Sequence, residues 1–259
     1  MRRTSLIGRR SFLKAAAGCG AALLAGCDQV SQNGTARRIF RSAEAVNRAI
    51  QRTLGPNALA AEFGEADISP FFKPNGTTDP DNDLYDEIAK DNFANYRLDV
   101  RGLVARPASF SLSELRAMPS RTQITRHDCV EGWSCIGKWT GARLGPLLER
   151  AGLKSSARYI VFHCADKLAG PEFSPPVPFY ESIGLDDAFH EQTILAYEMN
   201  GKALPVANGA PLRLRVERQL GYKHAKYVVV IEAVESFANI GGGNGSYWAD
   251  NGYAWYAGI

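Results

Sequence analysis

The sequence is poor in the residues and motifs that mark several large classes of protein. It holds five cysteines and four histidines, and it has no His-Glu-x-x-His pair, no Gly-rich phosphate loop and no Cys-x-x-Cys-His haem-attachment motif. No apolar run reaches the roughly twenty residues that a membrane-spanning helix needs. Internal repeats and low-complexity tracts are missing as well. These absences argue against a zinc hydrolase, a Rossmann or P-loop nucleotide-binding protein and a haem-carrying chain.

The first 27 residues have the pattern of an export leader. Arg9 and Arg10 are followed by Ser-Phe-Leu-Lys and then by an apolar run of about twelve residues, which fits a removable signal and is too short for a transmembrane anchor. The paired arginines resemble a twin-arginine (Tat) leader, which carries proteins already folded. The segment closes with Leu-Ala-Gly-Cys27, which resembles a bacterial lipobox; ordinary signal-peptidase cleavage nearby, with Cys27 incidental, is the alternative. We therefore expect a periplasmic protein with a possible lipid anchor at Cys27.

Loss of the leader changes the charge of the chain. Residues 1–26 carry five basic residues and no acidic ones, so the formal net charge of +3 becomes about −2. The sequence also lacks an aromatic and basic groove pattern. A nucleic-acid partner is not indicated.

The rest of the chain is long enough for one large domain with its own core. Residues 28–66 read as a polar tether, 28–36, followed by an amphipathic helix with apolar residues at helical spacing, which we expect to pack on its own domain. Residues 67–259 show a pattern of short strand-like segments separated by Pro, Gly and Asn. Four segments read as strands and two as short helices: YRLDVRG, ARYIVFHCA, LRLRVERQ and HAKYVVVIEAVESF, then SLSELRAM and TGARLGPLLERAG. We predict a β-rich α+β domain with few short helices.

Three cysteines remain in this domain, and an odd number cannot all pair with one another. A Cys135–Cys164 disulfide is one option, and it would leave Cys129 unpaired. A zinc site using Cys129, Cys135, Cys164 and His127 is a second option, but the nearest cysteines are separated by five residues, where structural zinc uses closer pairs. Plain packing is the third.

The segment RHDCVEGWSCIGKWTG, residues 126–141, resembles the cysteine segment of the sulfite-oxidase fold, a family of molybdopterin-dependent oxidoreductases that includes periplasmic methionine-sulfoxide reductase catalytic subunits. The similarity continues through residues 184–232, in the same order and at the same spacing as the family's cofactor-binding half. The resemblance implies a mixed-sheet molybdopterin-binding domain and a molybdenum cofactor.

The resemblance also implies roles for individual residues. Cys129 matches the catalytic thiolate that binds molybdenum. Seven further residues match positions that contact the cofactor in the family: Asn75, Cys164, Asn208, Arg213, His224, Ala225 and Lys226. The alignment of Asn75 is loose, and Cys164 stands where the reductases have a threonine. A thiolate suits a soft metal site, and Arg213 offers phosphate a planar fork. Arg213 and Arg215 fall on the same face of a predicted strand, where solvated charges are common, and the resemblance selects Arg213 but neither Arg215 nor Arg218, so we expect Arg215 to be a solvated charge. Trp133 and Trp139 are expected to wall the site or the core.

We therefore predict an exported oxidoreductase that transfers an oxygen atom between water and a small substrate, at sulfur or another heteroatom, using a molybdenum-molybdopterin cofactor and no haem. Electrons would then pass to or from a separate partner, such as a cytochrome or a membrane quinone-linked subunit. The alternative is a non-catalytic exported lipoprotein that uses the same fold as a binding or scaffold module, since fold alone does not establish chemistry. A sulfite-binding pocket should gather arginines, and Arg121, Arg126 and Arg143 are the candidates near Cys129 in sequence.

Overall fold

The computed structural model describes residues 34–55, 57–170 and 175–259. The export leader, Cys27 and most of the predicted tether lie outside these residues. The chain divides into two compact units, residues 1–49 and Ile50–Ile259. Helix α2, Gly34–Leu54, includes the whole amphipathic stripe, and its Val46 and Ile50 side chains are exposed. Among the described residues, no helix has the length and apolar character needed to cross a membrane.

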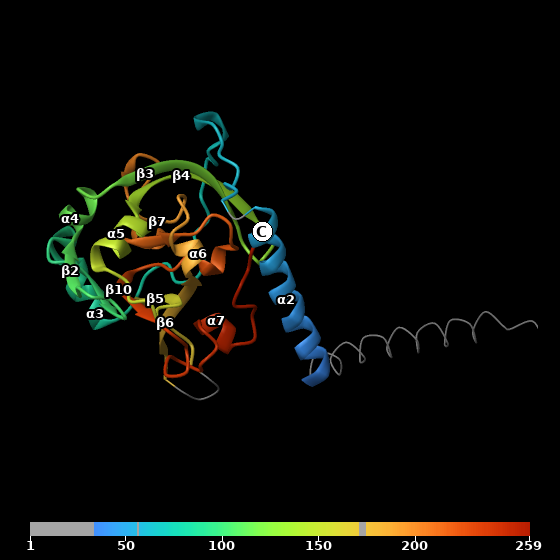
Figure 1. Ribbon diagram of the computed structural model, residues 1–259. Coiled ribbons are helices and arrows are strands. Elements are labelled where there is room, and N and C mark those ends of the chain that lie inside the picture. The colour runs from blue at the N-terminus through green and yellow to red at the C-terminus, as the bar shows by residue number, and fades with distance from the viewer. Residues whose placement is uncertain (1–33, 56, 171–174) are drawn as a thin grey trace, which may run out of the picture. The chain divides into compact units, whose positions relative to one another are not determined.

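The second unit consists mainly of two five-stranded β-sheets, the first mixed and the second antiparallel (Figure 1). The first has the order β2-β1-β10-β5-β6, and its strands are β1 Arg97–Gly102, β2 Ala108–Ser111, β5 Tyr159–Leu168, β6 Val177–Gly184 and β10 Val228–Val234. The second has the order β3-β4-β7-β8 with β9 paired to β7, and its strands are β3 Ser120–Asp128, β4 Ser134–Arg143, β7 Ile194–Met199, β8 Lys202–Ala203 and β9 Arg213–Arg215. The expectation of a β-rich α+β domain is confirmed.

Short helices and turns connect these strands. They are α3 Asp83–Ala89, α4 Leu112–Arg116, α5 Leu144–Ala151, α6 Leu185–Ala188 and α7 Tyr247–Asp250, with the 3-10 turns η1 Glu65–Asp67, η2 Lys90–Phe93, η3 Val206–Asn208 and η4 Gly221–Lys223. Helix α4 begins at the predicted capping box, in which the Ser111 hydroxyl accepts from the Glu114 N–H and Glu114 accepts from the Ser111 N–H. Helix α5 ends at Gly152, whose φ of +69° is the left-handed cap that glycine adopts without strain.

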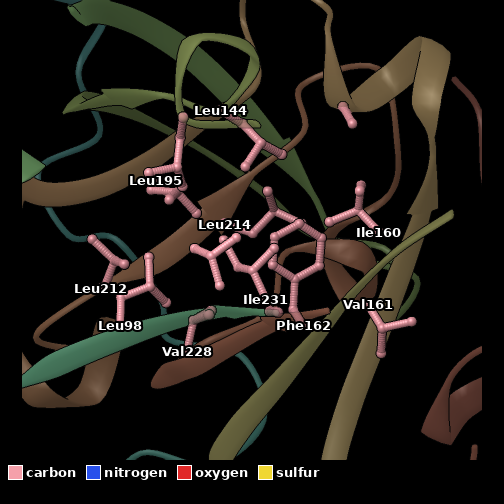
Figure 2. Packing of buried hydrophobic residues seen from close by; sticks show 14 of the residues in the cluster. Leu98, Leu144, Ile160, Val161, Phe162, Leu195, Leu212, Leu214, Val228 and Ile231 are labelled. Carbon is pink, nitrogen blue, oxygen red and sulfur yellow. The ribbon is translucent and has the colours of Figure 1, made fainter. Parts of the chain in front are cut away.

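The main core lies between the two sheets. Figure 2 shows Leu195 and Leu214 from the β7–β9 side meeting Phe162 and Ile231 from the other sheet, and all four side chains are fully buried. Leu144 of α5 belongs to the same cluster. Each fully buried side chain of this size stabilises the fold by about 1.5–3 kcal/mol relative to exposure, so the cluster fixes how one sheet sits on the other.

The last residues return to the loop that follows β9. The Leu220 N–H donates to the Ala257 carbonyl at 2.9 Å and the Ile259 N–H donates to the Arg218 carbonyl at 3.0 Å. The Tyr222 hydroxyl donates to the Ala254 carbonyl at 2.8 Å. Turn η4 is therefore held from one side by the C-terminal segment.

Candidate functional site

Cys129 lies at the tip of a long antiparallel hairpin made by β3 and β4, which arches over β7 in Figure 1. The strands pair up to Asp128 and Ser134, and the Cys129 N–H then donates to the Trp133 carbonyl at 2.9 Å. The Gly132 N–H donates to the Cys129 carbonyl, and Gly132 has a φ of +85°, a conformation that favours glycine. The turn thus fixes the backbone of Cys129 on both sides.

The Cys129 thiol is free and half-buried. Burial raises the pKa of this thiol, and the N–H of Glu131 opposes that rise. A thiol that stays protonated at neutral pH is protected from exchange reactions, yet it can lose its proton to a metal ion that binds it. Its position at a hairpin tip leaves it open to a ligand from one side.

A second group of predicted residues is gathered around η3, β9 and η4. Arg213 donates from Nη1 to the Asn208 carbonyl at 2.8 Å and from Nη2 to the His224 carbonyl at 3.5 Å. The Lys226 ammonium donates to the Ala207 carbonyl at 3.0 Å and to the Thr77 carbonyl. Asn208, Arg213, His224 and Lys226, which are scattered over nineteen positions of the sequence, form one buried cluster.

This cluster carries two buried cations, and the buried Asp166 carboxyl interacts electrostatically with Lys226. Within the described residues, neither Arg213 nor Lys226 forms an ion pair, although Arg213 is fully buried and Lys226 nearly so. Burial lowers the pKa of Arg213 to about 9, and burial together with Arg213 lowers that of Lys226 to about 7. A buried cation is costly unless an anion accompanies it. The cluster is therefore suited to bind an anionic group.

The hairpin and the cluster meet at Gly221. A Cβ atom on Gly221 would come within 2.4 Å of His127 Nε2 and 3.2 Å of the Asp128 carbonyl oxygen. The rings of His127 and His224 lie edge to face with centroids 5.1 Å apart. Asn75 reaches the same turn, donating from Nδ2 to the Gly221 carbonyl at 3.4 Å. The thiol-bearing turn and the cationic cluster are thus two walls of one site.

Several polar atoms of this site are buried and make no hydrogen bond. They are Asn75 Oδ1, His127 Nε2, Asn208 Nδ2, Arg213 Nε and His224 Nδ1. Buried polar groups in folded proteins are nearly always paired, so a concentration of unpaired ones indicates a ligand. Donors, acceptors and cations here fit a group that has both a heterocycle and a phosphate.

Two predicted residues have other surroundings. Cys164 lies on β5 opposite Val228 of β10, and its side chain is part of the main hydrophobic core. Burial raises the pKa of the Cys164 thiol, with Asp166 and Glu181 adding to the effect. Ala225 is fully buried, and its carbonyl accepts the Leu214 N–H at 2.8 Å. A cofactor contact by either residue stays a prediction.

The expectation that Arg215 is a solvated charge was wrong. Arg215 is fully buried and forms a two-point ion pair with Glu217, with Nε to Oε1 at 2.8 Å and Nη2 to Oε2 at 2.6 Å. Its guanidinium and that of Arg213 both lie over the buried Trp139 ring, at 4.4 and 5.0 Å from the centroid. The signal was in the sequence, because Arg-x-Arg-x-Glu puts opposite charges on one face of a strand.

The alternatives for the cysteines are also resolved for the described residues. Cys129, Cys135 and Cys164 are all free, and Cys135 and Cys164 belong to different sheets, so the disulfide between them does not form. In the same part of the chain, no three His, Cys, Asp or Glu side chains gather in a way that could hold a metal ion. The zinc arrangement is therefore not found there.

Comparison with known proteins agrees with this geometry. Residues 85–239 match the family described as "Oxidoreductase molybdopterin binding domain". The chain is 35% identical over 254 residues to YedZ1 of Azospira oryzae, which is named as a protein-methionine-sulfoxide reductase subunit, and the match covers 96% of this chain and 87% of that one. It is 42% identical over 144 residues to the protein-methionine-sulfoxide reductase catalytic subunit MsrP of Xanthomonas axonopodis pv. citri, where it covers 52% of this chain and 44% of the relative.

A solved structure, the sulfane dehydrogenase SoxCD from Paracoccus pantotrophus, matches with a TM-score of 0.48 and 23% identity over 55% of this chain and 39% of that one. On the sequence matches, the chain belongs to the molybdopterin-binding oxidoreductase family, and the predicted family is confirmed. It is an oxidoreductase with a molybdopterin-binding domain. The chain spans less than half the length of the Xanthomonas MsrP.

Proposed function

We propose that this protein is an exported reductase that removes oxygen from a sulfoxide, with Cys129 as the ligand of the cofactor's molybdenum. The observation that carries the proposal is the free thiol of Cys129 at the tip of a hairpin whose preceding residues, His127 and Asp128, meet the buried cationic cluster with its unpaired polar atoms at Gly221. In the overall reaction, the sulfoxide takes up two electrons and two protons, its sulfur–oxygen bond breaks, and a thioether and water leave. The cofactor, when bound, supplies the two-electron oxygen-atom transfer.

The chain's own residues hold and orient the cofactor. Arg213 and Lys226 would hold its phosphate, because both are buried cations and neither forms an ion pair among the described residues. The amides of Asn75 and Asn208 and the ring of His224 offer unpaired atoms to its heterocycle. Cys129 would hold the metal as a thiolate, and the N–H groups of Glu131 and Val130, which lower the pKa of this thiol against the effect of burial, would stabilise the thiolate form.

The rim of the site favours a sulfoxide over sulfite. Phe71 and Val130, which flank the Cys129 turn, are 72% and 50% exposed, and Trp133 closes the turn under the ammonium of Lys73. Exposed apolar side chains beside a reactive group suit the carbon substituents of a sulfoxide. The names of the MsrP and YedZ1 relatives support a methionine sulfoxide within a protein as the substrate.

The three arginines considered as sulfite ligands are either paired with carboxylates or far from Cys129. Arg126 pairs with Asp128 at 2.8 Å, and Arg121 pairs with Glu62 and Glu191 at 2.5 and 2.9 Å. Arg143 pairs with Ile194 of β7 and lies at the end of β4 farthest from Cys129. At about 3.3 Å per residue, Arg121 and Arg143 lie roughly 20 Å or more from the tip along their strands.

Electrons come from a separate partner in this proposal. The relatives are named as a subunit and a catalytic subunit, which supports assembly with a second, electron-donating protein. The sequence carries no haem-attachment motif of its own. Export follows the twin-arginine leader, and Cys27 carries the lipid anchor if the lipobox is used.

The test uses protein recovered from the periplasm after expression with its leader. Molybdenum and pterin are measured per chain, and turnover is then compared with peptide methionine sulfoxide plus a reduced dye, and with sulfite plus an oxidised dye. We expect near-stoichiometric molybdenum and faster sulfoxide reduction. Faster sulfite oxidation would contradict the substrate assignment. Properly exported protein without molybdenum would instead favour the binding or scaffold module.

A further inference from the structure

A fully buried polar chain runs beneath the hairpin from β3 to the residues after β9. Gln123 donates from Nε2 to Glu217 Oε1 at 2.9 Å, and Glu217 holds Arg215 by the two contacts given above. Arg215 Nη1 reaches His127 Nδ1 at 3.0 Å. All four residues are at most 4% exposed. None of them is among the residues that the family resemblance selects.

The direction of the last hydrogen bond fixes the form of the His127 ring. A guanidinium has five N–H donors and no acceptor, so Arg215 donates and His127 Nδ1 accepts. Nδ1 therefore carries no proton, and the proton of the neutral ring is on Nε2. The two-point contact with Glu217 keeps Arg215 in place, which keeps this tautomer in place.

The Nε2–H group of His127 points at the candidate site without a partner. Nε2 is buried and makes no hydrogen bond, and it is the atom that a side chain on Gly221 would strike, at 2.4 Å. The neighbouring His224 ring offers the site a hydrogen-bond acceptor where His127 offers a donor. Its Nε2 lies 3.0 Å from the Gln219 carbonyl, to which it must donate, so its unpaired Nδ1 is an acceptor. A donor and an acceptor thus lie side by side, on rings 5.1 Å apart.

We infer that His127 donates a hydrogen bond from Nε2 to the molybdenum-molybdopterin cofactor, and that Arg215, held by Glu217, is a positioning residue that sets its tautomer. A pterin carries ring N–H donors beside carbonyl and ring-nitrogen acceptors, so its edge can satisfy His127 and His224 together. The inference adds a cofactor-binding residue to the site proposed above and rests on the cofactor being bound at Cys129. Leaving the Nε2–H buried and unpaired would cost about 1–3 kcal/mol.

The first experiment reads the tautomer directly in the intact holoprotein. With ¹⁵N-labelled histidine, nitrogen chemical shifts separate a protonated ring nitrogen from an unprotonated one. We expect His127 Nδ1 unprotonated and Nε2 protonated, with an Nε2–H proton that is protected from exchange in holoprotein and shifts when the cofactor is absent. A protonated Nδ1, or an Nε2–H signal that is the same with and without cofactor, would overturn the inference.

The second experiment measures how firmly the cofactor is held. His127→Phe keeps a ring and removes the donor, whereas His127→Gln keeps an N–H of similar reach. The rate of molybdenum loss during dialysis should rise about three- to tenfold for His127→Phe and less for His127→Gln. The matched control is His163→Gln, because His163 is half-exposed and bonds Glu232 at 2.9 Å on the other sheet. Equal loss rates for wild type and His127→Phe would refute the role of His127.

Arg215 is tested through its effect on His127. Arg215→Met combined with Glu217→Met removes both charges, so neither is left buried alone. We expect the His127 ring of this variant to populate both tautomers, and the Mo(V) electron paramagnetic resonance spectrum to change in the same way as in His127→Phe. An unchanged tautomer would refute the positioning role. If exported wild-type protein contains no molybdenum, the cofactor site itself is refuted. If the wild type contains molybdenum but neither the His127 ring signals nor the His127→Phe variant responds to the cofactor, only this inference is refuted.

Discussion

At the scale of single residues, the site is defined by charges that the protein alone does not neutralise. Arg215 pairs with Glu217, whereas Arg213 donates to carbonyls and lies over the Trp139 ring. Lys226 donates to carbonyls and lies in the field of the buried Asp166, with which it forms no ion pair among the described residues. Such an arrangement lowers the stability of the cofactor-free protein and is compensated when an anion binds. The same buried charges thus lower the stability of the cofactor-free protein and raise its affinity for an anionic cofactor.

Cys129→Ser should abolish molybdenum binding through sulfur while the domain still folds. Serine is nearly the same size, and the residue lies in a half-exposed turn, but its hydroxyl is a poor ligand for a soft metal site. Molybdenum content and the thiolate-to-metal absorption band measure the effect. Cys135→Ser, on the neighbouring strand, is the control and should retain both signals. A Cys129→Ser protein with wild-type turnover would remove Cys129 from the mechanism.

Arg213→Ala should weaken cofactor binding by about 1.5–3 kcal/mol, or roughly tenfold to a hundredfold, through loss of charge-assisted bonds to the phosphate. Arg213→Lys should recover only part of this, since lysine has no planar fork. Arg101→Ala is the control of equal charge, because Arg101 is an exposed residue of β1 paired with Glu232 at 3.4 Å. Molybdenum and pterin per chain are the readouts. A full complement of both in Arg213→Ala would show that the phosphate is held elsewhere.

Lys226 should make the stability of the cofactor-free protein depend on pH. Its pKa of about 7 in the folded state is below the ordinary value near 10.4, so between these values the unfolded chain binds more protons. The free energy of unfolding therefore rises as pH increases from 7 to about 8.5, by at most about 1.4 kcal/mol per pH unit. Denaturant titrations at several pH values should show this slope, and Lys226→Met should flatten it. An equal slope in the variant would assign the effect to another group.

At the scale of elements, the sequence predicted the regular parts well. The strands β1, β5 and β10 and the capped helix α4 lie where alternation and capping place them. The segment LRLRVERQ was predicted to be one strand, but only Arg213–Arg215 is extended, because the residues after Val216 turn into η4. Strand patterns report which residues face inward, and they do not report where a buried ion pair will bend the chain.

The site itself could be predicted only in part, for the same reason. The cysteine segment and the run of cofactor contacts are local patterns, so their residues could be named from the sequence. The pairing of His127 with Arg215 joins β3 to β9, and no local pattern specifies a contact between residues so far apart. The sequence gives the chemistry of each wall, whereas the fold determines how the walls meet.

Gly221→Ala tests the contact between those walls. The new Cβ would lie 2.4 Å from His127 Nε2, so η4 or the hairpin must move, at a cost of about 1–3 kcal/mol. We expect a lower melting temperature and a reduced molybdenum content. The control is Gly64→Ala, whose Cβ would make only an ordinary contact of 3.4 Å with Asp67, and it should match wild type. Undisturbed cofactor content in Gly221→Ala would mean that the two walls do not share one ligand.

At the scale of the whole molecule, the proposed export route links export to cofactor loading, because a twin-arginine leader carries proteins already folded. Replacing Arg9 and Arg10 with lysine preserves the positive charge but should leave the precursor in the cytoplasm, because the twin-arginine route requires the arginine pair. Cell fractionation measures this. The same exchange at Arg2 and Arg3 is the control and should not affect export. Periplasmic accumulation of the Arg9 and Arg10 variant would argue against the twin-arginine route.

The central pairing of the first sheet determines when the molecule can be completed during synthesis. Strand β1 pairs with β2 on one edge, and on its other edge it pairs in parallel with β10, with Asp99 opposite Val230, so that second edge stays open until residues 228–234 have been synthesised. Contacts so distant in sequence form slowly. The Cys129 hairpin is synthesised before these residues, and its two strands need only local pairing with each other. The cationic wall, residues 208–226, is synthesised later, directly before β10. We therefore expect the cationic wall to be fixed against the hairpin only when β10 joins the first sheet.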